Sequence, residues 1–294
     1  MQVILHTGVH ATDDDRLLRG LTRNAADWRD DGVAVPGPSR YRQLLSDAVH
    51  ALAQGTPAPE AREVLLEAIL TDDPEHVDRM VLSNRNFFCV PKLALQGGVL
   101  YARAEERVAA FKALFAGDEI ELFMGVRNPA TFLPALFAES PSNDFYDFVA
   151  GVDPRTLRWS DLVRRLRAAH PDVALTVWCN EDTPLIWGQI LREMAGIELN
   201  RKIRGAFDLL SDIMVPEGMK RFRAYLSAHP NMTERQKRRV MIAFLDKYAL
   251  DEAIEEELEI PVGWTEAVID EMTEDYEDDM LTLERMRGVT VIAP

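Results

Sequence analysis

The feature that most constrains the fold is an alternation of short apolar runs with longer amphipathic stretches along the first two-thirds of the chain. The apolar runs are rich in Val, Ile, Leu or Phe and lack polar alternation, which is typical of strands covered on both faces. We predict strands at residues 2–6, 79–83, 120–126 and 173–179. We predict helices at residues 13–30, 41–53, 59–70, 102–115, 130–138, 160–170 and 184–195. This order indicates a three-layer α/β fold with a mostly parallel central sheet and right-handed crossovers.

The last third of the chain shows only helical patterns before its final residues. We predict helices at residues 205–228, 233–250 and 264–286, followed by a short edge strand at residues 288–292. We find no internal repeat, low-complexity linker or strong domain boundary, and 294 residues suit one large α/β domain. We therefore predict a single domain over residues 1–294, in which residues 201–294 form a helical portion packed on an α/β core of residues 1–200.

Negative charge is concentrated toward the C-terminal end. The formal net charge is −16, and residues 251–280 contain fourteen Asp and Glu but no Lys or Arg. Residues 201–239 contain ten Lys and Arg against four Asp and Glu. We expect the two segments to be helices that face each other or solvent. Because an acidic surface repels phosphates, we expect no nucleic-acid partner.

The last predicted helix carries an apolar stripe with a period of four residues. Its members are Trp264, Val268, Met272, Tyr276 and Met280, with acidic residues between them. An amphipathic helix of this kind needs an apolar surface to cover its stripe. We expect it to pack on the body of the protein, and a partner-binding face is the alternative.

The composition also bears on the cellular setting. No apolar run approaches the ~18 residues of a membrane span, and the first five residues lack the basic lead-in of a signal peptide. Two cysteines, Cys89 and Cys179, are too few for a disulfide scaffold. We expect a cytoplasmic protein without a membrane partner.

The loop after the first predicted strand is the strongest candidate for a ligand site, because ligands in such sheets often lie against the next helix N-terminus. Residues 6–17 read His-Thr-Gly-Val-His-Ala-Thr-Asp-Asp-Asp-Arg-Leu. This segment resembles the loop of P-loop sulfotransferases, in particular a bacterial branch with the pattern H-x-G-x-H-K-T-G-T-T-x-L. The resemblance implies a P-loop-type α/β domain and a site for 3′-phosphoadenosine 5′-phosphosulfate (PAPS).

The loop keeps the frame of the family pattern and departs from it at the residues that hold phosphate. The matching residues are His6, Gly8, His10, Thr12 and Leu17. Ala11 replaces the family's lysine, and Asp13, Asp14 and Asp15 replace Gly-Thr-Thr. A carboxylate about 4 Å from a phosphate opposes binding by about 1 kcal/mol in water and about 4 kcal/mol near a protein surface. We therefore expect no PAPS cofactor.

The three aspartates also have a structural interpretation. Thr12 is predicted to be the N-cap of the following helix, with the aspartates in its first turn complementing the helix dipole. Their carboxylates would then stand where a bound phosphate would lie. The alternative is a metal site formed by His6, His10 and Asp14, but no clear fourth ligand accompanies them, and we expect no metal.

A second resemblance follows the central strand. Sulfotransferases carry Arg-Asn/Asp-Pro there, and this arginine and a serine about eight residues later bind the 3′-phosphate of the cofactor. Here the segment is Arg127-Asn128-Pro129, and Ala135 stands at the serine position. The resemblance implies that Arg127 and Asn128 lie at the 3′-phosphate position. An arginine paired with a carboxylate at a helix start is the alternative.

Two further segments resemble the same family. Residues 82–87, Leu-Ser-Asn-Arg-Asn-Phe, resemble a Ser-Ser-Glu-Asn-Phe run in which the family's glutamate is Arg85. Residues 263–265, 272–279 and 288–289 resemble the tail of the bacterial branch, which forms a helix over the sheet. Near the fourth strand, Cys179 is interpreted as a buried strand-end cysteine, and Glu181 as a pocket residue.

These observations favour a sulfotransferase-like binding or scaffold protein whose partner is an unknown small molecule or protein. An enzyme of altered chemistry that uses Arg127 and His10 is one alternative, and a working sulfotransferase with a rebuilt cofactor loop is another. The catalytic candidates are His10 and Glu181. The remaining histidines are predicted to lie at the surface, namely His50, His76, His170 and His229.

Overall fold

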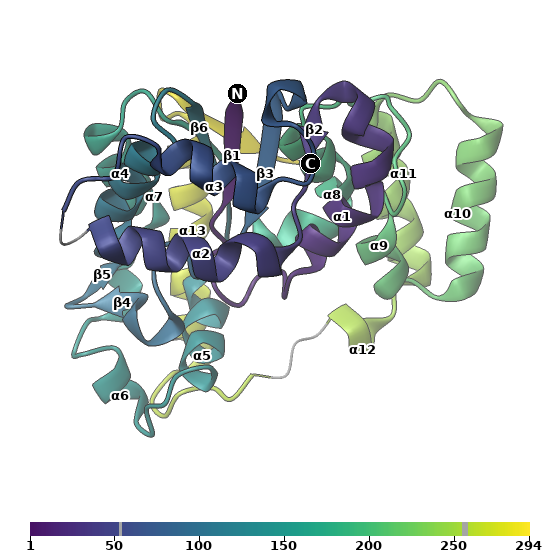
Figure 1. Cartoon of the computed structure of the whole chain (residues 1–294). Helices are drawn as coiled ribbons and strands as arrows, with labels where there is room; N and C mark the ends of the chain where they lie inside the picture. The colour runs from purple at the N-terminus through teal and green to yellow at the C-terminus, as the bar shows by residue number, and fades with distance from the viewer. Residues whose placement is uncertain (53–54, 255–257) are drawn as a thin grey trace.

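The predicted apolar runs form a fully parallel sheet in the computed structural model, which describes residues 1–52, 55–254 and 258–294. The six strands lie in the order β2-β3-β1-β6-β7-β8 (Figure 1). They are β1 (Gln2–His6), β2 (Val33–Ala34), β3 (Arg79–Ser83), β6 (Glu119–Val126), β7 (Ala174–Cys179) and β8 (Val289–Ile292). A separate antiparallel pair consists of β4 (Leu95–Gln96) and β5 (Val99–Leu100). The four predicted strands and the predicted edge strand are confirmed, whereas the two-residue strands were not predicted.

Helices follow the strands as the alternating pattern predicts. In the first two-thirds they are α1 (Arg16–Trp28), α2 (Pro38–Leu52), α3 (Ala61–Ile69), α4 (Ala104–Leu114), α5 (Pro129–Ala138), α6 (Phe145–Phe148), α7 (Trp159–Ala169) and α8 (Thr183–Ala195). In the last third they are α9 (Asp208–Asp212), α10 (Pro216–Ala228), α11 (Glu234–Tyr248), α12 (Asp251–Ile254) and α13 (Glu266–Glu284). Short 3₁₀ turns are η1 (Arg29–Asp31), η2 (Pro74–His76), η3 (Pro91–Leu93), η4 (Pro154–Thr156) and η5 (Asn180–Asp182).

Both faces of the sheet are covered, which gives three layers (Figure 1). Side chains of a strand alternate between the two faces, so Val3 and Leu5 enter one core while Ile4 enters the other. The first core packs the sheet against α2, α3, α4, α5, α7 and α13, and the second packs it against α1 and α8. This double coverage explains why the strands lack polar alternation.

Helices α9, α10 and α11 form a small cluster of their own. Its buried residues come from α9, α10, α11 and the turn before α10. In Figure 1 these helices lie to the right of α8. The prediction of one continuous helix over residues 205–228 is wrong. Pro216 begins a new helix and holds Val215 in an extended conformation, with ψ of 145°. Met214 pairs instead with Ala249 in an isolated bridge.

The apolar stripe of the acidic helix packs on the body, as predicted. Met272, Tyr276 and Leu283 of α13 are buried in the first core, and Trp264 and Met280 are half-buried against it. β8, which follows α13, extends the sheet beside β7. Burial of these side chains therefore holds the C-terminal segment on the α/β core.

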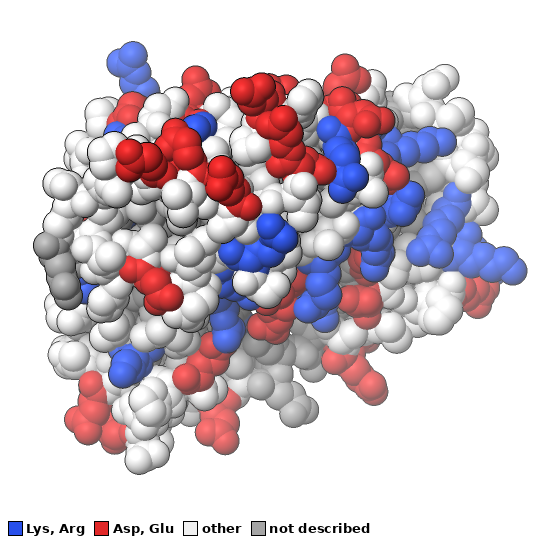
Figure 2. Space-filling model, viewed as in Figure 1, with Lys and Arg blue, Asp and Glu red and all other residues white. Residues whose placement is uncertain are grey.

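The acidic and basic segments were expected to face each other or solvent, and ion pairs join each of them to other parts of the chain. Glu271 and Asp275 of α13 pair with Arg155 and Arg158, at 3.3 and 2.8 Å. The basic segment instead reaches the aspartates around the end of α1: Arg201 pairs with Asp31 at 2.6 Å and Arg204 with Asp27 at 3.0 Å. Lys and Arg side chains accordingly gather over α1, α9 and α10 in Figure 2.

Two parts of the sequence predictions lie outside the described residues. These are the end of the helix predicted at residues 41–53 and residues 255–257 of the acidic segment. In the described part of the chain, none of the helices combines the length and the apolar character needed to cross a membrane.

Candidate functional site

The parallel register brings most of the predicted site residues to one edge of the sheet. At this carboxyl edge, His6 lies opposite Ser83 of β3 and Phe123 of β6, and Val126 lies opposite Cys179 of β7. The chain leaves β1 toward β2 on one side and leaves β6 toward β7 on the other. Such a reversal places a crevice between the two strand ends, where ligands of open α/β sheets commonly bind.

The β1–α1 loop, residues 7–15, is tied to the end of β6 by its backbone. The Val9 amide donates to the Gly125 carbonyl at 3.0 Å, and the Gly125 amide donates to the Gly8 carbonyl at 2.9 Å. Gly8 has φ of +94°, and a Cβ atom there would lie 3.3 Å from the His10 amide nitrogen. Glycine therefore makes this turn possible.

His10 is fully buried beneath the loop. Its Nδ1 lies 2.8 Å from the Tyr101 hydroxyl and its Nε2 lies 3.1 Å from Asn86 Oδ1. Burial lowers the pKa of His10 to about 4, so the imidazole is neutral near pH 7. Both ring nitrogens are engaged within the protein, and the side chain has no exposed surface.

His6 is buried at the end of β1 and is held through one nitrogen. Its Nδ1 lies 2.8 Å from Ser83 Oγ, and its ring stacks on Trp178. Among the described residues, His6 Nε2 and the neighbouring Thr7 Oγ1 are buried without a hydrogen-bond partner. Burial lowers the pKa of His6 as well.

The prediction that Thr12 is the N-cap is wrong, but one of the aspartates does place negative charge at the start of the helix. Helix α1 begins at Arg16, its N-cap position is Asp15, and Thr12 Oγ1 donates back to the Val9 carbonyl at 2.7 Å. Asp13 supplies the anion at the helix N-terminus, because its Oδ2 accepts from the Leu17 amide at 3.0 Å. The reason lies in the backbone: Asp14 and Asp15 have φ of 46° and 61°, which turns the chain before the helix can start.

Asp15 forms an ion pair across the edge of the sheet. Both of its carboxylate oxygens accept from Arg42 of α2, at 2.5 and 2.9 Å. Arg42 also donates to the Ser83 carbonyl at 2.9 and 3.1 Å. The hydrogen bonds from Arg42 hold the pKa of Asp15 below its usual range. Asp14 is the exposed member of the trio, and its carboxylate lies 3.9 Å from Arg85.

Arg127 emerges from the end of β6 and is almost completely buried. Its Nη1 donates to the Ala11 carbonyl at 2.5 Å, and its Nε donates to Thr131 Oγ1 at 3.0 Å. Arg127, which was predicted to bind phosphate, thus contacts the backbone of the β1–α1 loop at Ala11.

Asn128 and Glu181 link the carboxyl edge to the C-terminal helix. The Asn128 side chain caps α5 by accepting from the Ala130 amide, and it donates to Thr273 of α13 at 2.9 Å. Glu181 accepts from the Asn128 amide at 2.9 Å and from the Tyr276 hydroxyl at 3.1 Å. These contacts give Glu181 the role of an anchor for α13.

Cys179 belongs to the same network. It ends β7, is half-buried, and its Sγ lies 3.0 Å from Glu181 Oε2 and 3.2 Å from the Tyr276 hydroxyl. Burial raises the pKa of Cys179 to about 12. Burial also raises the pKa of Tyr276 well above its ordinary value. Both groups therefore remain protonated near neutral pH, and the thiol is not an activated nucleophile.

The metal alternative finds no support in the geometry. The part of the chain that the structure describes holds no group of three or more His, Cys, Asp or Glu side chains arranged to bind a metal ion.

The prediction that His170 lies at the surface is wrong. It is buried at the end of α7, where its Nε2 lies 2.8 Å from the Glu105 carbonyl oxygen.

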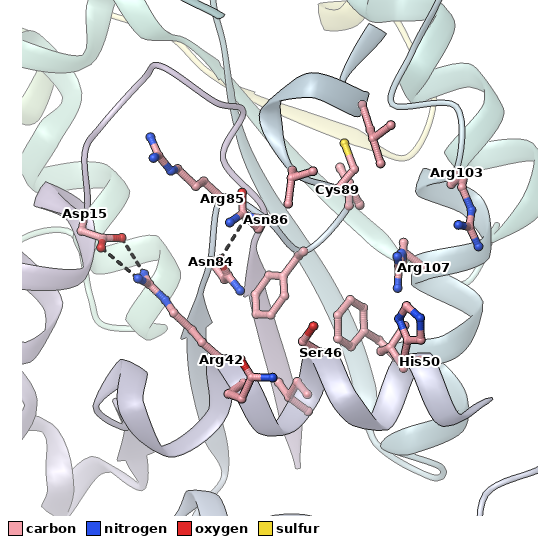
Figure 3. Close-up of a pocket in the computed structure, with 18 of the residues that line it drawn as sticks. Asp15, Arg42, Ser46, His50, Asn84, Arg85, Asn86, Cys89, Arg103 and Arg107 are labelled. Carbon is pink, nitrogen blue, oxygen red and sulfur yellow. Dashed lines mark hydrogen bonds and ion pairs between the residues drawn. The ribbon is translucent and has the colours of Figure 1, made fainter. Parts of the chain in front are cut away.

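A cavity of about 720 Å³ opens beside the β1–α1 loop, between α2, α4 and the segment after β3. We call it the α2–α4 cavity (Figure 3). Its charged lining residues are Asp14, Asp15, Arg42, Arg85, Arg103 and Arg107, and His50 adds an imidazole. Its apolar lining includes Phe87, Phe88 and Phe111. The volume lies in the range of ~300–1,000 Å³ that is usual for small-molecule sites.

Sequence reasoning singled out only part of this cavity. Arg85 and the aspartates were singled out, His50 was predicted only to lie at the surface, and Arg42, Arg103 and Arg107 were not identified. Arg42 and His50 belong to α2, Arg107 belongs to α4, and Arg103 is the residue before α4, so they come from two regions far apart in the sequence. The four-residue spacing of Arg103 and Arg107, which places both on one helix face, is the signal that could have drawn attention to them.

Comparison of the chain with protein-family models, with curated proteins and with solved structures found no match.

Proposed function

We propose that the chain is a sulfotransferase-like α/β protein that does not use PAPS and instead binds a small molecule in the α2–α4 cavity. The first support is the set of matches in the β1–α1 loop and at Arg127-Asn128-Pro129, which meet at one edge of the sheet. The second is the cavity at that same edge.

One observation carries the proposal against PAPS-dependent transfer. The groups that would hold the phosphates of the cofactor are engaged by the chain itself: the Asp13 carboxylate accepts from the Leu17 amide at the α1 N-terminus, where the phosphosulfate would lie, and Arg127, the expected 3′-phosphate ligand, donates to the Ala11 carbonyl. A phosphate would have to displace an anion that is already part of the loop. It would also meet the nearby carboxylates of Asp14 and Asp15, each of which opposes its binding.

The two catalytic candidates also fit a binding protein better than a transferase. A general base must reach the substrate's proton within hydrogen-bond distance. His10 is sealed beneath the loop by Tyr101 and Asn86, and Glu181 is engaged by the Asn128 amide and the Tyr276 hydroxyl.

Titration calorimetry with adenosine 3′,5′-bisphosphate, the desulfated form of the cofactor, tests the proposal. We expect a dissociation constant weaker than roughly 1 mM for the natural chain. The matched variant carries Ala11→Lys, Asp13→Gly, Asp14→Thr and Asp15→Thr, which restores the family pattern, and we expect it to bind more tightly. Micromolar affinity of the natural chain would overturn the proposal and favour an active sulfotransferase.

A further inference from the structure

The two ends of the α2–α4 cavity differ in how their arginines are compensated. At one end, Arg42 forms its ion pair with Asp15, and Arg85 lies 3.1 Å from Glu139. At the other end, Arg103, Arg107 and His50 come together (Figure 3). These three residues also line a second, neighbouring cavity, which confirms that they lie side by side between α2 and α4.

Arg107 differs from the other arginines of the cavity. Arg103 pairs with Glu106 at 2.8 Å, and Glu105, the other acidic residue of that helical turn, pairs with Arg165 at 2.8 Å. Among the residues that the structure describes, no carboxylate lies within ion-pair distance of Arg107, and its buried Nε has no hydrogen-bond partner. A half-buried guanidinium without an anion is costly unless a ligand compensates it.

The surroundings of Arg107 increase this cost. Burial, and then the neighbouring charge of Arg103, lower the pKa of Arg107, while the charge of Glu106 acts in the opposite direction and does not outweigh them. Arg103 stands at the N-cap position of α4, the positive end of its dipole, where a cation is unfavourable. The thiol of Cys89 adds no negative charge to offset them, because burial raises the pKa of Cys89 to about 12.

We infer that the Arg103–Arg107–His50 end of the α2–α4 cavity binds the oxyanion group of a small ligand whose apolar, ring-sized body lies along Phe87, Phe88 and Phe111. A phosphate monoester, a sulfate or a carboxylate shares the required chemistry. Guanidinium groups match the planar spacing of such oxygens. The net charge of −16 gives no general attraction for anions, so this local arrangement must supply the selectivity.

This inference rests on the proposed function, because it assumes that the ligand occupies the α2–α4 cavity. The contacts that carry it are nevertheless separate from the β1–α1 loop. Arg103 and Arg107 belong to the start of α4, and His50 belongs to α2. The two proposals can therefore fail independently.

Phenyl phosphate is a suitable probe, because it joins a phosphate monoester to one aromatic ring. We expect calorimetry or NMR titration to show binding of phenyl phosphate, and weaker binding of both phenol and inorganic phosphate. Benzoate and phenyl sulfate then distinguish the sources of the oxyanion. Arg107→Gln is expected to weaken the binding of phenyl phosphate about tenfold or more, as the loss of a charge-assisted hydrogen bond does.

Arg221→Gln is the matched control, because Arg221 is an exposed residue of α10 and pairs with Glu217. It is expected to leave the affinity for phenyl phosphate unchanged. Arg107→Lys, which keeps the charge but loses the planar fork, is expected to restore part of the affinity. This partial rescue separates recognition of the anion from a general effect on folding.

Three results would overturn the inference. They are equal binding of phenol and phenyl phosphate, equal affinities of the natural chain and Arg107→Gln, and no binding of phenyl phosphate at millimolar concentration. The first two would leave the proposed function standing, since a ligand would still bind in the cavity or beside it. Failure of the proposed function would instead be seen as tight binding of adenosine 3′,5′-bisphosphate that the Arg107→Gln change does not alter.

Discussion

The β1–α1 loop and the α2–α4 cavity lie side by side at the same edge of the sheet, yet their charged groups are arranged in opposite ways. In the loop, Asp13 occupies the helix N-terminus and Arg127 binds a loop carbonyl. In the cavity, Arg107 has no anionic partner among the described residues. The comparison shows that charged groups of the loop are bonded within the chain, whereas the adjoining cavity holds a guanidinium for which we propose a ligand as the anionic partner.

The largest expected effect comes from removal of α13, the helix that Glu181 anchors at the carboxyl edge of the sheet. Deletion of residues 261–294 removes α13 and β8, and with them the buried side chains of Met272, Tyr276, Leu283 and Ile292. Each buried apolar side chain contributes ~1.5–3 kcal/mol, against a total stability of ~5–15 kcal/mol for a typical domain. We expect the shortened chain to lose cooperative unfolding and to aggregate, as light scattering and thermal denaturation would show.

This outcome should depend little on salt, because the ion pairs of α13 lie at the surface, in contact with solvent, and contribute only ~0–1 kcal/mol each. A shortened chain that stays monomeric and equally stable would mean that α13 is an interaction segment, and the search for a function would then move to its partner.

The loss of stability in acid distinguishes His10, the buried histidine of the loop, from His50, the exposed histidine of the cavity. The pKa of His10 is about 4 in the folded protein, below the ordinary value of 6.5. The unfolded chain therefore binds this proton first, so its contribution to stability is complete above pH ~6.5 and is lost as the pH falls toward 4. The loss is on the order of 3 kcal/mol.

His10→Asn and His50→Asn form the matched pair for this prediction, measured by urea denaturation between pH 4 and 7. We expect the pH dependence to be shallower in His10→Asn than in His50→Asn, because the His10 side chain is fully buried and the His50 side chain is exposed. A lowered pKa of His6 acts in the same direction and leaves some residual slope. An unchanged slope in His10→Asn would show that this imidazole is not sealed beneath the loop.

A smaller change in the free energy of unfolding is expected from the replacement of two arginines, one with an ion-pair partner and one without such a partner in the described part of the chain. Arg42→Gln breaks the ion pair with Asp15 and the bonds to the Ser83 carbonyl, and we expect a loss of about 1–2 kcal/mol in the free energy of unfolding. Arg107→Gln removes a cation that lacks a partner, so the stability should stay unchanged or rise. Equal losses in the two variants would remove the distinction between a compensated and an uncompensated cation.

The smallest expected effect concerns the anion at the start of α1. Asp13→Asn removes the charge beside the Leu17 amide and should cost ~0.3–1 kcal/mol in low salt, less in high salt. Asp14→Asn is the control, because Asp14 is exposed and asparagine tolerates its positive φ. Melting temperatures of the two variants at two salt concentrations would test this; a larger loss for Asp14→Asn would contradict it.

The sequence predicted the fold well because the strands are covered on both faces and so form distinct apolar runs. It missed β2, β4 and β5, since two residues are too short to give a periodic signal. It also joined α9 to α10, although Pro216 after an extended Val215 is a recognisable break.

The site was predicted less completely, for two physical reasons. Residues next to a strand end, such as His10 and Arg127, could be placed at the carboxyl edge because the register of a parallel sheet fixes that edge. Arg42 and Arg107 lie within helices, and only the packing of α2 beside α4 brings them to one cavity. The partners of the ion pairs could not be predicted from the sequence either. Several cations could have paired with Asp15, and the folded structure brings Arg42 to it.

Hydrogen exchange in the presence of either ligand tests the central claim most directly. We propose that the ligand lies in the α2–α4 cavity and that the β1–α1 loop binds no phosphate. Phenyl phosphate should therefore protect amides in residues 84–90 and 103–111, and adenosine 3′,5′-bisphosphate should leave residues 7–18 unchanged. Protection of residues 7–18 by adenosine 3′,5′-bisphosphate, without protection of residues 103–111 by phenyl phosphate, would contradict the account.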